Sequence, residues 1–146
     1  MKTILAPTDF SVSSLNAVNY AADLAYSINA KLVLIHAIPF PIAVSEISVP
    51  GDFIDDMMDA SQKDMDELFE RVQSRTKGKI SISTEIKIGS IEQEIENISS
   101  RERPLAVVTG IRSGWRQVDL QRRLRVIERR LSLQVRRMRL LQAQLA

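Results

Sequence analysis

Several short apolar runs of the sequence end in residues that could hydrogen-bond a small ligand. Hydroxyl and carboxylate side chains can bind the polar groups of such a ligand, and so can main-chain groups at the end of a strand. A glycine lets main-chain N–H groups approach an anion closely. The candidate ligand-binding residues at or just after these run ends are Pro7, Thr8, Asp9, His36, Ala37, Gly89, Ser90, Thr109 and the stretch from Gly110 to Gly114.

Residue types that support covalent or metal chemistry are scarce in this chain. There is no cysteine, and the single histidine, His36, stands inside an apolar run, where a core histidine with a satisfied hydrogen bond is the expected role. Asp55 and Asp59 fit a solvated helix face better than an oxygen cage for a cation. No serine–histidine pair or paired carboxylate motif is evident. The sequence therefore predicts no catalytic residue, no metal site and no enzyme.

Apolar patterning indicates strands and helices in strict alternation. The run KLVLIHAI is continuously apolar, as in a strand buried on both faces, whereas KISISTEIK alternates, as in a half-exposed strand near an edge. This order predicts an α/β fold with a parallel sheet of four to five strands and helices on both faces. The expected strands are residues 1–6, 31–38, 79–87 and 105–109, and the expected helices are 11–28, 52–75 and 90–101, with a loop at 39–51.

The topology of such a sheet indicates where a ligand would bind. Parallel sheets bind ligands beyond the carboxyl ends of their strands, at the point where the strand order reverses. The candidate residues named above all fall at these ends. We therefore expect the fold to gather them in one crevice.

Four segments of the sequence together resemble the universal stress protein family. They are ILAPTDFS, LVLIHAI, KIGSIEQEI and PLAVVTG, in the order and spacing of that family, and the resemblance covers roughly residues 1–114. It implies a Rossmann-like fold of the adenine nucleotide alpha hydrolase type with a five-stranded parallel sheet. It also implies a homo-oligomer, usually a dimer, and a site for ATP or AMP, since some members of the family bind ATP.

The resemblance assigns roles to individual residues. Pro7, Thr8 and Asp9 match the family's turn beneath the adenosine, and Ala37 matches the residue whose main chain contacts adenine. Asp9 has a second interpretation, because an aspartate at this place could instead cap the helix that follows.

The phosphate motif of the family, Gly-x2-Gly-x9-Gly-Ser/Thr, is not preserved. Gly110 can serve as its first glycine, but Ser113 stands where the second should be, and no glycine follows Gly114. Such a loop presents close-packed N–H groups to the anion, which a charge on Arg112 does not replace. We therefore expect a degraded nucleotide site, with Thr109, Gly110, Arg112 and Ser113 as its remaining phosphate-side candidates.

Charge divides the chain into two segments. Residues 1–100 carry 8 basic and 15 acidic side chains, whereas residues 101–146 carry 12 arginines, no lysine and 3 acidic side chains. The net charge of +2 is thus an average of −7 and +9. We expect a domain over residues 1–114 and a separate Arg/Leu-rich segment over residues 115–146.

The Arg/Leu-rich segment allows several conformations. Its apolar positions from Leu120 to Leu145 follow a heptad spacing, interrupted by Gln134, which favours a continuous Arg-rich helix. A second possibility ends the last helix at Arg130 and places a fifth strand around Leu131, Leu133 and Val135. Disorder, or a natural end replaced by another sequence, is also compatible with the pattern.

These observations suggest two classes of function. One is a regulatory stress-response domain with a degraded adenine-nucleotide site. The other is an oligomerisation or interaction module, whose basic helix would associate with itself or with an acidic protein partner. Binding to nucleic acid is not expected, because no aromatic residue follows Trp115 and the domain is acidic. A cytoplasmic location without a membrane segment is expected, since no apolar run is long enough to span a bilayer.

Overall fold

A parallel five-stranded sheet organises the molecule, and a computed structural model describes residues 1–39, 50–110 and 141–142 of it. The strand order is β3-β2-β1-β4-β5, so the predicted α/β class is confirmed. The strands are β1 Thr3–Pro7, β2 Lys31–Ile38, β3 Ile82–Ile88, β4 Ala106–Thr109 and β5 Leu141–Gln142, and the helices are α1 Val12–Ile28, α2 Gly51–Arg75 and α3 Ile91–Glu102.

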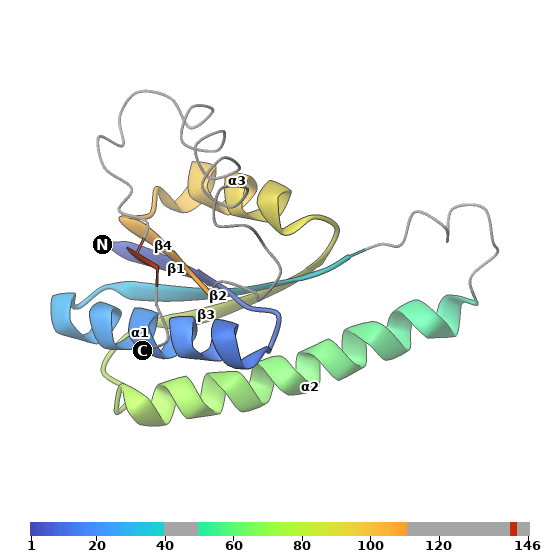
Figure 1. The fold of residues 1–146 in the computed structure, drawn as a ribbon, viewed down its shortest axis with the longest axis horizontal. Helices are drawn as coiled ribbons and strands as arrows, with labels where there is room; N and C mark the ends of the chain where they lie inside the picture. Colours follow the sequence, from blue (N-terminus) through green and yellow to red (C-terminus); the bar gives the residue numbers. More distant parts are fainter. Residues whose placement is uncertain (40–49, 111–140, 143–146) are drawn as a thin grey trace.

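The helices cover both faces of the sheet, with α1 and α2 on one face and α3 on the other (Figure 1). Side chains of β1 and β2 alternate between these layers, since Ile4 and Leu34 pack with α1 and α2 while Leu5 and Val33 pack with α3. Both strands are buried on both faces, which is why their sequences read as continuous apolar runs.

The starts of α1 and α3 follow from their sequences. Ser11 and Ser90 are the N-caps, and their hydroxyl groups accept hydrogen bonds from the main-chain N–H groups of Ser14 and Gln93, at 3.3 Å and 3.2 Å. The predicted bounds of both helices are thereby confirmed to within one residue.

β3 begins later than the alternating pattern suggests. Lys77 and Gly78 have positive φ angles of 53° and 62°, and the N–H of Lys79 still bonds back to the carbonyl of Thr76. The chain is therefore turning where the pattern predicts a strand. Pairing with β2 starts only at Ile82, whose register partner is Leu32. β3 lies at one edge of the sheet, as its half-exposed pattern indicates.

The Arg/Leu-rich segment contributes β5. Leu141 and Gln142 pair in parallel with Val108 and Thr109 of β4. A helix continuous to the C-terminus is therefore wrong at these two residues, because their main chain bonds to the sheet edge instead. The rest of that prediction, including the alternative strand at Leu131, Leu133 and Val135, lies outside the described residues.

Candidate functional site

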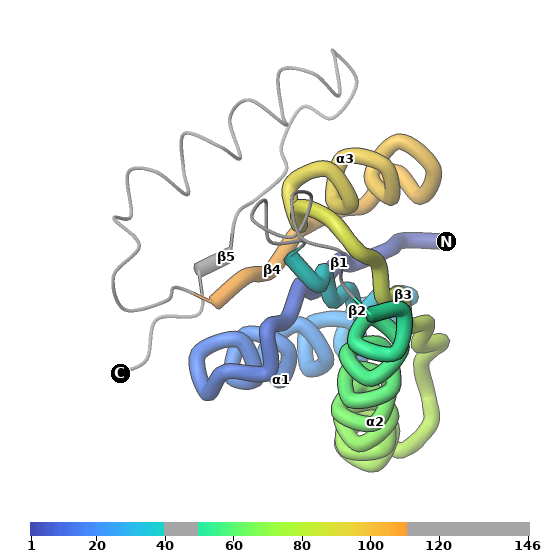
Figure 2. The backbone as a smooth tube through the Cα atoms, turned by 90° about the vertical axis from the view of Figure 1, so that its right-hand side faces the viewer, coloured from blue at the N-terminus to red at the C-terminus, as the bar shows by residue number. Residues whose placement is uncertain are grey.

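The reversal of strand order lies between β1 and β4. The chain runs from β1 outward to β2 and β3 on one side, and from β1 to β4 and β5 on the other. Crossovers in opposite directions leave a crevice beyond the carboxyl ends of β1 and β4. Figure 2 looks along the strands toward these ends. Pro7 and Thr109 are the last residues of the two strands, so these two predicted residues lie at the reversal of strand order.

The turn after β1 is held by hydrogen bonds from the first turn of α1. The hydroxyl groups of Thr8 and Ser14 lie 3.0 Å apart, and Thr8 Oγ1 also accepts from the N–H of Phe10 at 3.0 Å. Thr8 is 5% exposed, so these bonds satisfy a buried hydroxyl. Phe10 has a φ of 61°, a conformation that this network must hold in place.

Asp9 is exposed and lies in this turn, between Thr8 and the start of α1. Its Oδ1 accepts a hydrogen bond from the N–H of Ser11 at 3.0 Å, while Ser11 itself is the N-cap of α1. Asp9 therefore does not cap the helix directly but orders the residue that does.

His36 joins β2 to the same turn. Its Nδ1 lies 2.8 Å from the carbonyl oxygen of Thr8, which can only accept, so Nδ1 carries the proton and donates. The ring is half-buried and lies 4.6 Å, centroid to centroid, from the ring of Phe10. The predicted satisfied histidine is thus found, but at the crevice end of β2.

The main chain of Ala37 faces the space beyond β1. Along β2, the carbonyl of Ile35 accepts from Thr8 N at 2.8 Å, and the carbonyl of Ile38 accepts from Gly89 N at 2.9 Å. Successive residues of a parallel strand bond alternately to the two neighbouring strands, so Ala37 is directed to the β1 side, as Ile35 is. Because β1 ends at Pro7, opposite Ile35, the N–H and C=O of Ala37 point past its end.

Gly110, on the β4 side, packs against α1. A Cβ atom added there would lie 2.5 Å from the carbonyl oxygen of Ser13 and 2.8 Å from its Oγ. This close approach of two main chains requires glycine at position 110. Thr109 is half-buried and donates from Oγ1 to the carbonyl of Gly110 at 3.2 Å. The other phosphate-side candidates, Arg112 and Ser113, lie outside the described residues.

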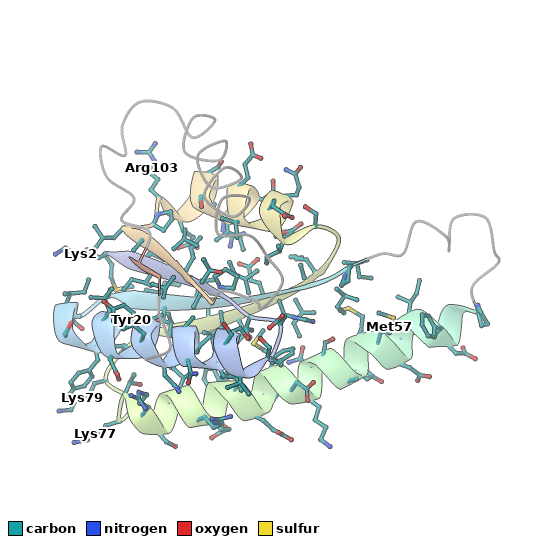
Figure 3. The ribbon with its side chains drawn as sticks, viewed as in Figure 1. Lys2, Tyr20, Met57, Lys77, Lys79 and Arg103 are labelled. Atoms are coloured by element: carbon teal, nitrogen blue, oxygen red, sulfur yellow. The ribbon has the colours of Figure 1, made fainter. Side chains whose placement is uncertain are left out.

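Several cations lie away from the crevice. Figure 3 shows Lys2, Lys77, Lys79 and Arg103 at the end of the sheet where the strands begin. In the described ranges, no three histidine, aspartate or glutamate side chains lie close enough together to hold a metal ion. Nor does any helix of these ranges have the length and apolarity to cross a bilayer.

The structure brings together Pro7, Thr8, Asp9, Ala37 and Gly110, all of which the sequence singled out. It adds Ser14 and Phe10, which sequence reasoning missed. The only signal for Ser14 was a run of serines after Asp9, a pattern that does not distinguish Ser14 from Ser11 and Ser13.

Comparison with known proteins decides the family. The sequence matches the model of the universal stress protein family over residues 1–125. The chain is a universal stress protein. The match extends past residue 114, where the sequence suggests a domain boundary. No curated protein matches the sequence significantly.

Solved structures share the fold of this universal stress protein. A family member from Burkholderia pseudomallei superposes with a TM-score of 0.67 at 18% identity, covering 86% of this chain and 89% of that one. UspA from Lactobacillus plantarum gives 0.59 at 20% identity, covering 79% and 82%. A universal stress protein in complex with cAMP gives 0.52 at 23% identity, covering 74% and 75%. At these identities the likeness establishes the fold.

Proposed function

We propose that this universal stress protein is a non-catalytic, cytoplasmic sensor that binds the adenosine part of an adenine nucleotide, AMP or ATP, in the crevice between β1 and β4. The observation that carries the proposal is the position of Thr8, Asp9 and the Ala37 main chain at the reversal of strand order. The structure of a universal stress protein with cAMP supports a nucleotide of this class as the ligand.

Each residue would have a defined task. The N–H and C=O of Ala37 form an adjacent donor and acceptor, the combination that the edge of adenine requires. The carboxylate of Asp9 would accept hydrogen bonds from the ribose hydroxyl groups. Thr8 and His36 would act by holding the turn in place, since their hydrogen bonds run within the protein.

The phosphate chain would contribute little to this binding. Gly110 is packed against Ser13, so its lack of a side chain serves the contact between β4 and α1. Lys2, Lys77 and Arg103 lie at the opposite end of the sheet (Figure 3). The proposed site, degraded on its phosphate side, therefore recognises adenosine rather than a triphosphate.

Calorimetric titration with AMP tests this proposal. Asp9→Ala should raise the Kd at least about tenfold, because a hydrogen bond to a charged group contributes about 1.5–3 kcal/mol. Asp9→Asn keeps an oxygen that can accept from Ser11 N, so it separates ligand contact from turn geometry. Asp56→Ala, an exposed position on α2, is the matched control and should leave the Kd unchanged. Equal affinities for the wild-type protein and Asp9→Ala would refute the role of Asp9, and undetectable AMP binding would refute the site.

The same proposal includes a homodimer, as the family resemblance implies.

A second candidate function rests on charge, since residues 101–146 carry 12 arginines and 3 acidic side chains. This segment would bind an acidic protein partner. Binding of a poly-glutamate peptide that disappears on replacing the Arg129–Arg130 and Arg136–Arg137 pairs by glutamine would support it, and unchanged binding would exclude it.

A further inference from the structure

Basic side chains stand at the start of four adjacent strands. In the order of the sheet they are Lys79 before β3, Lys31 at the start of β2, Lys2 before β1 and Arg103 before β4. These strands are parallel, so their starts lie at one end of the sheet, where Lys31 N donates to Lys2 O at 2.8 Å. Because neighbouring strands lie about 4.8 Å apart, the four starts span roughly 14 Å.

Four exposed cations at this end form what we call the basic face: Lys2, Lys77, Lys79 and Arg103 (Figure 3). None of the four forms an ion pair within the part of the chain that the structure describes. The carboxylates of the adjoining helices pair with other cations. Lys31 Nζ lies 3.1 Å from Glu102 Oε2, and Arg75 Nε lies 2.7 Å from Asp23 Oδ1. The positive charge of the basic face is therefore available to an anion outside the protein.

Exposed apolar and aromatic side chains accompany these cations. Met1 and Leu105 stand before β1 and β4 and are 89% and 44% exposed. Tyr26, in the last turn of α1, is 42% exposed, and Lys79 Nζ lies 5.9 Å from the centroid of its ring. Cations combined with exposed apolar and aromatic side chains are typical of protein surfaces that bind the interface of a lipid bilayer.

Acidic side chains are concentrated at the other end of the molecule. The first part of α2, residues 51–66, carries six aspartates and one lysine. Figure 3 shows Met57, in this part of α2, at the end opposite Lys77 and Lys79. An anionic surface would attract the basic face and repel the acidic part of α2, so this separation of charge would orient the protein. The crevice at the carboxyl ends of the strands would then face away from the surface.

We propose that the basic face binds the surface of a membrane containing anionic lipids, from the cytoplasmic side and without spanning the bilayer. Each lysine or arginine beside such a surface raises the partition coefficient about fivefold, so the four cations together would raise it several hundredfold. The side chains of Met1 and Leu105 would enter the layer of headgroups. This surface goes beyond the proposed nucleotide site and does not depend on it.

Other polyanions fit the basic face less well. Stacking of nucleic-acid bases requires a free aromatic ring, whereas the ring of Tyr26 already lies next to Lys79. An acidic peptide would satisfy the cations but would leave the exposed side chains of Met1 and Leu105 without an apolar environment. A bilayer interface accommodates both kinds of side chain.

Co-sedimentation of the full chain with vesicles tests the role of charge. The vesicles are phosphatidylcholine with about 30% phosphatidylserine, and pure phosphatidylcholine should not bind the protein. The double variant Lys2→Gln with Arg103→Gln should lower the partition coefficient about thirtyfold. Lys63→Gln with Lys87→Gln is the matched control, because both lysines are exposed outside the basic face and the loss of net charge is the same. An equal fall for both double variants would overturn the basic face.

An apolar substitution tests contact with the bilayer independently of charge. Leu105→Ser should lower the partition coefficient about fivefold, while circular dichroism shows that the fold persists. Val12→Ser, at an exposed position on the first turn of α1, is the matched control and should leave binding unchanged. Equal binding by Leu105→Ser and the wild-type protein would refute insertion into the headgroup layer.

Competition identifies the anion. Inorganic phosphate at the ionic strength of the assay should not displace the protein from vesicles, because single anions do not span the row of cations. Displacement by phosphate would instead indicate a site for a free anion. If vesicles do not bind the wild-type protein, the membrane assignment is refuted. Binding of poly-glutamate or of a single-stranded oligonucleotide that is lost in the Lys2→Gln, Arg103→Gln variant would then assign the basic face to that polyanion.

Discussion

The two sides of the crevice are built in different ways. On the β1 side, a side-chain network orders the turn: Thr8 bonds to Ser14 and to the N–H of Phe10, and His36 bonds to the carbonyl of Thr8. On the β4 side, the main feature is a close contact, in which Gly110 lies against Ser13. The β1 side is thus ordered by polar bonds within the protein, whereas the β4 side is ordered by close packing.

Gly110, at the end of β4, has a different role in the structure from the one that the sequence suggests. From the sequence, Gly110 is the remaining glycine of a phosphate loop. In the structure it is needed whether or not an anion binds, because a Cβ would overlap the main chain of Ser13. A glycine that fits a binding motif can therefore also be required by packing.

The largest effect should come from Gly110→Ala. The added methyl group meets main-chain atoms, which cannot rotate away, so we expect a loss of about 3 kcal/mol in the free energy of unfolding, at the upper end of the range for overpacking. Urea denaturation measures it. Gly51→Ala is the control, since no atom lies within 4 Å of the added Cβ, and its stability should change by less than about 0.5 kcal/mol. If both variants are equally stable, Gly110 is not fixed by packing.

The next largest loss of stability should come from Thr8→Val, which we compare with Thr109→Val on the β4 side. Thr8→Val removes a buried hydroxyl that bonds to two groups, so it should lower the free energy of unfolding by about 1–2 kcal/mol. Thr109→Val removes one bond, 3.2 Å long, from a half-buried residue, and should lower it by less than about 0.5 kcal/mol. Equal losses, measured by urea denaturation, would contradict the difference between the two sides.

The affinities for AMP and ATP test whether only the β1 side recognises the nucleotide. If only the β1 side recognises the nucleotide, AMP and ATP should bind with Kd values within about threefold of each other, a difference of less than about 0.7 kcal/mol. Titration calorimetry of both ligands at one ionic strength is the measurement. An ATP affinity more than about tenfold above that of AMP would instead indicate a working phosphate site.

The smallest effect lies at the other end of the sheet. Lys31 Nζ lies 3.1 Å from Glu102 Oε2, and this hydrogen bond lowers the pKa of Glu102 from its ordinary value of 4.5. A carboxylate with a lowered pKa stabilises the fold fully above that ordinary value, and the stabilisation is lost as the pH falls below it. The wild-type protein should thus melt at a slightly higher temperature than Glu102→Gln at pH 7, and the gap should close as the pH falls through the lowered pKa of Glu102. A gap that persists in acid would show that charge is not its cause.

Much of the domain could be predicted from local patterns. Lys31–Ile38 has the predicted bounds because a strand buried on both faces must be apolar throughout. Ser11 and Ser90 marked the starts of α1 and α3 because a serine hydroxyl can satisfy a free helix N–H. The strand ends Pro7 and Thr109 lie at the reversal of strand order because parallel strands joined by crossovers of one hand fix where that reversal occurs.

Other features could not be predicted from local patterns because they depend on residues that are distant in sequence. The start of β3 was misplaced because Ile80 continues the alternating pattern while the chain still turns at Lys77 and Gly78. The strand at Leu141–Gln142 was not expected, since a heptad pattern does not reveal that the edge of β4 needs a partner.

By itself, the sequence determined the α/β class, the order of elements and the residues at the strand ends, because hydrophobic periodicity and helix caps are local properties. Only the tertiary structure decided that Ser14 and His36 hold the turn at Thr8, that Gly110 is packed against Ser13, and that β3 is left at an open edge. The physical reason is that hydrogen bonds, close contacts and unpaired edges arise between residues that only the folded chain brings together.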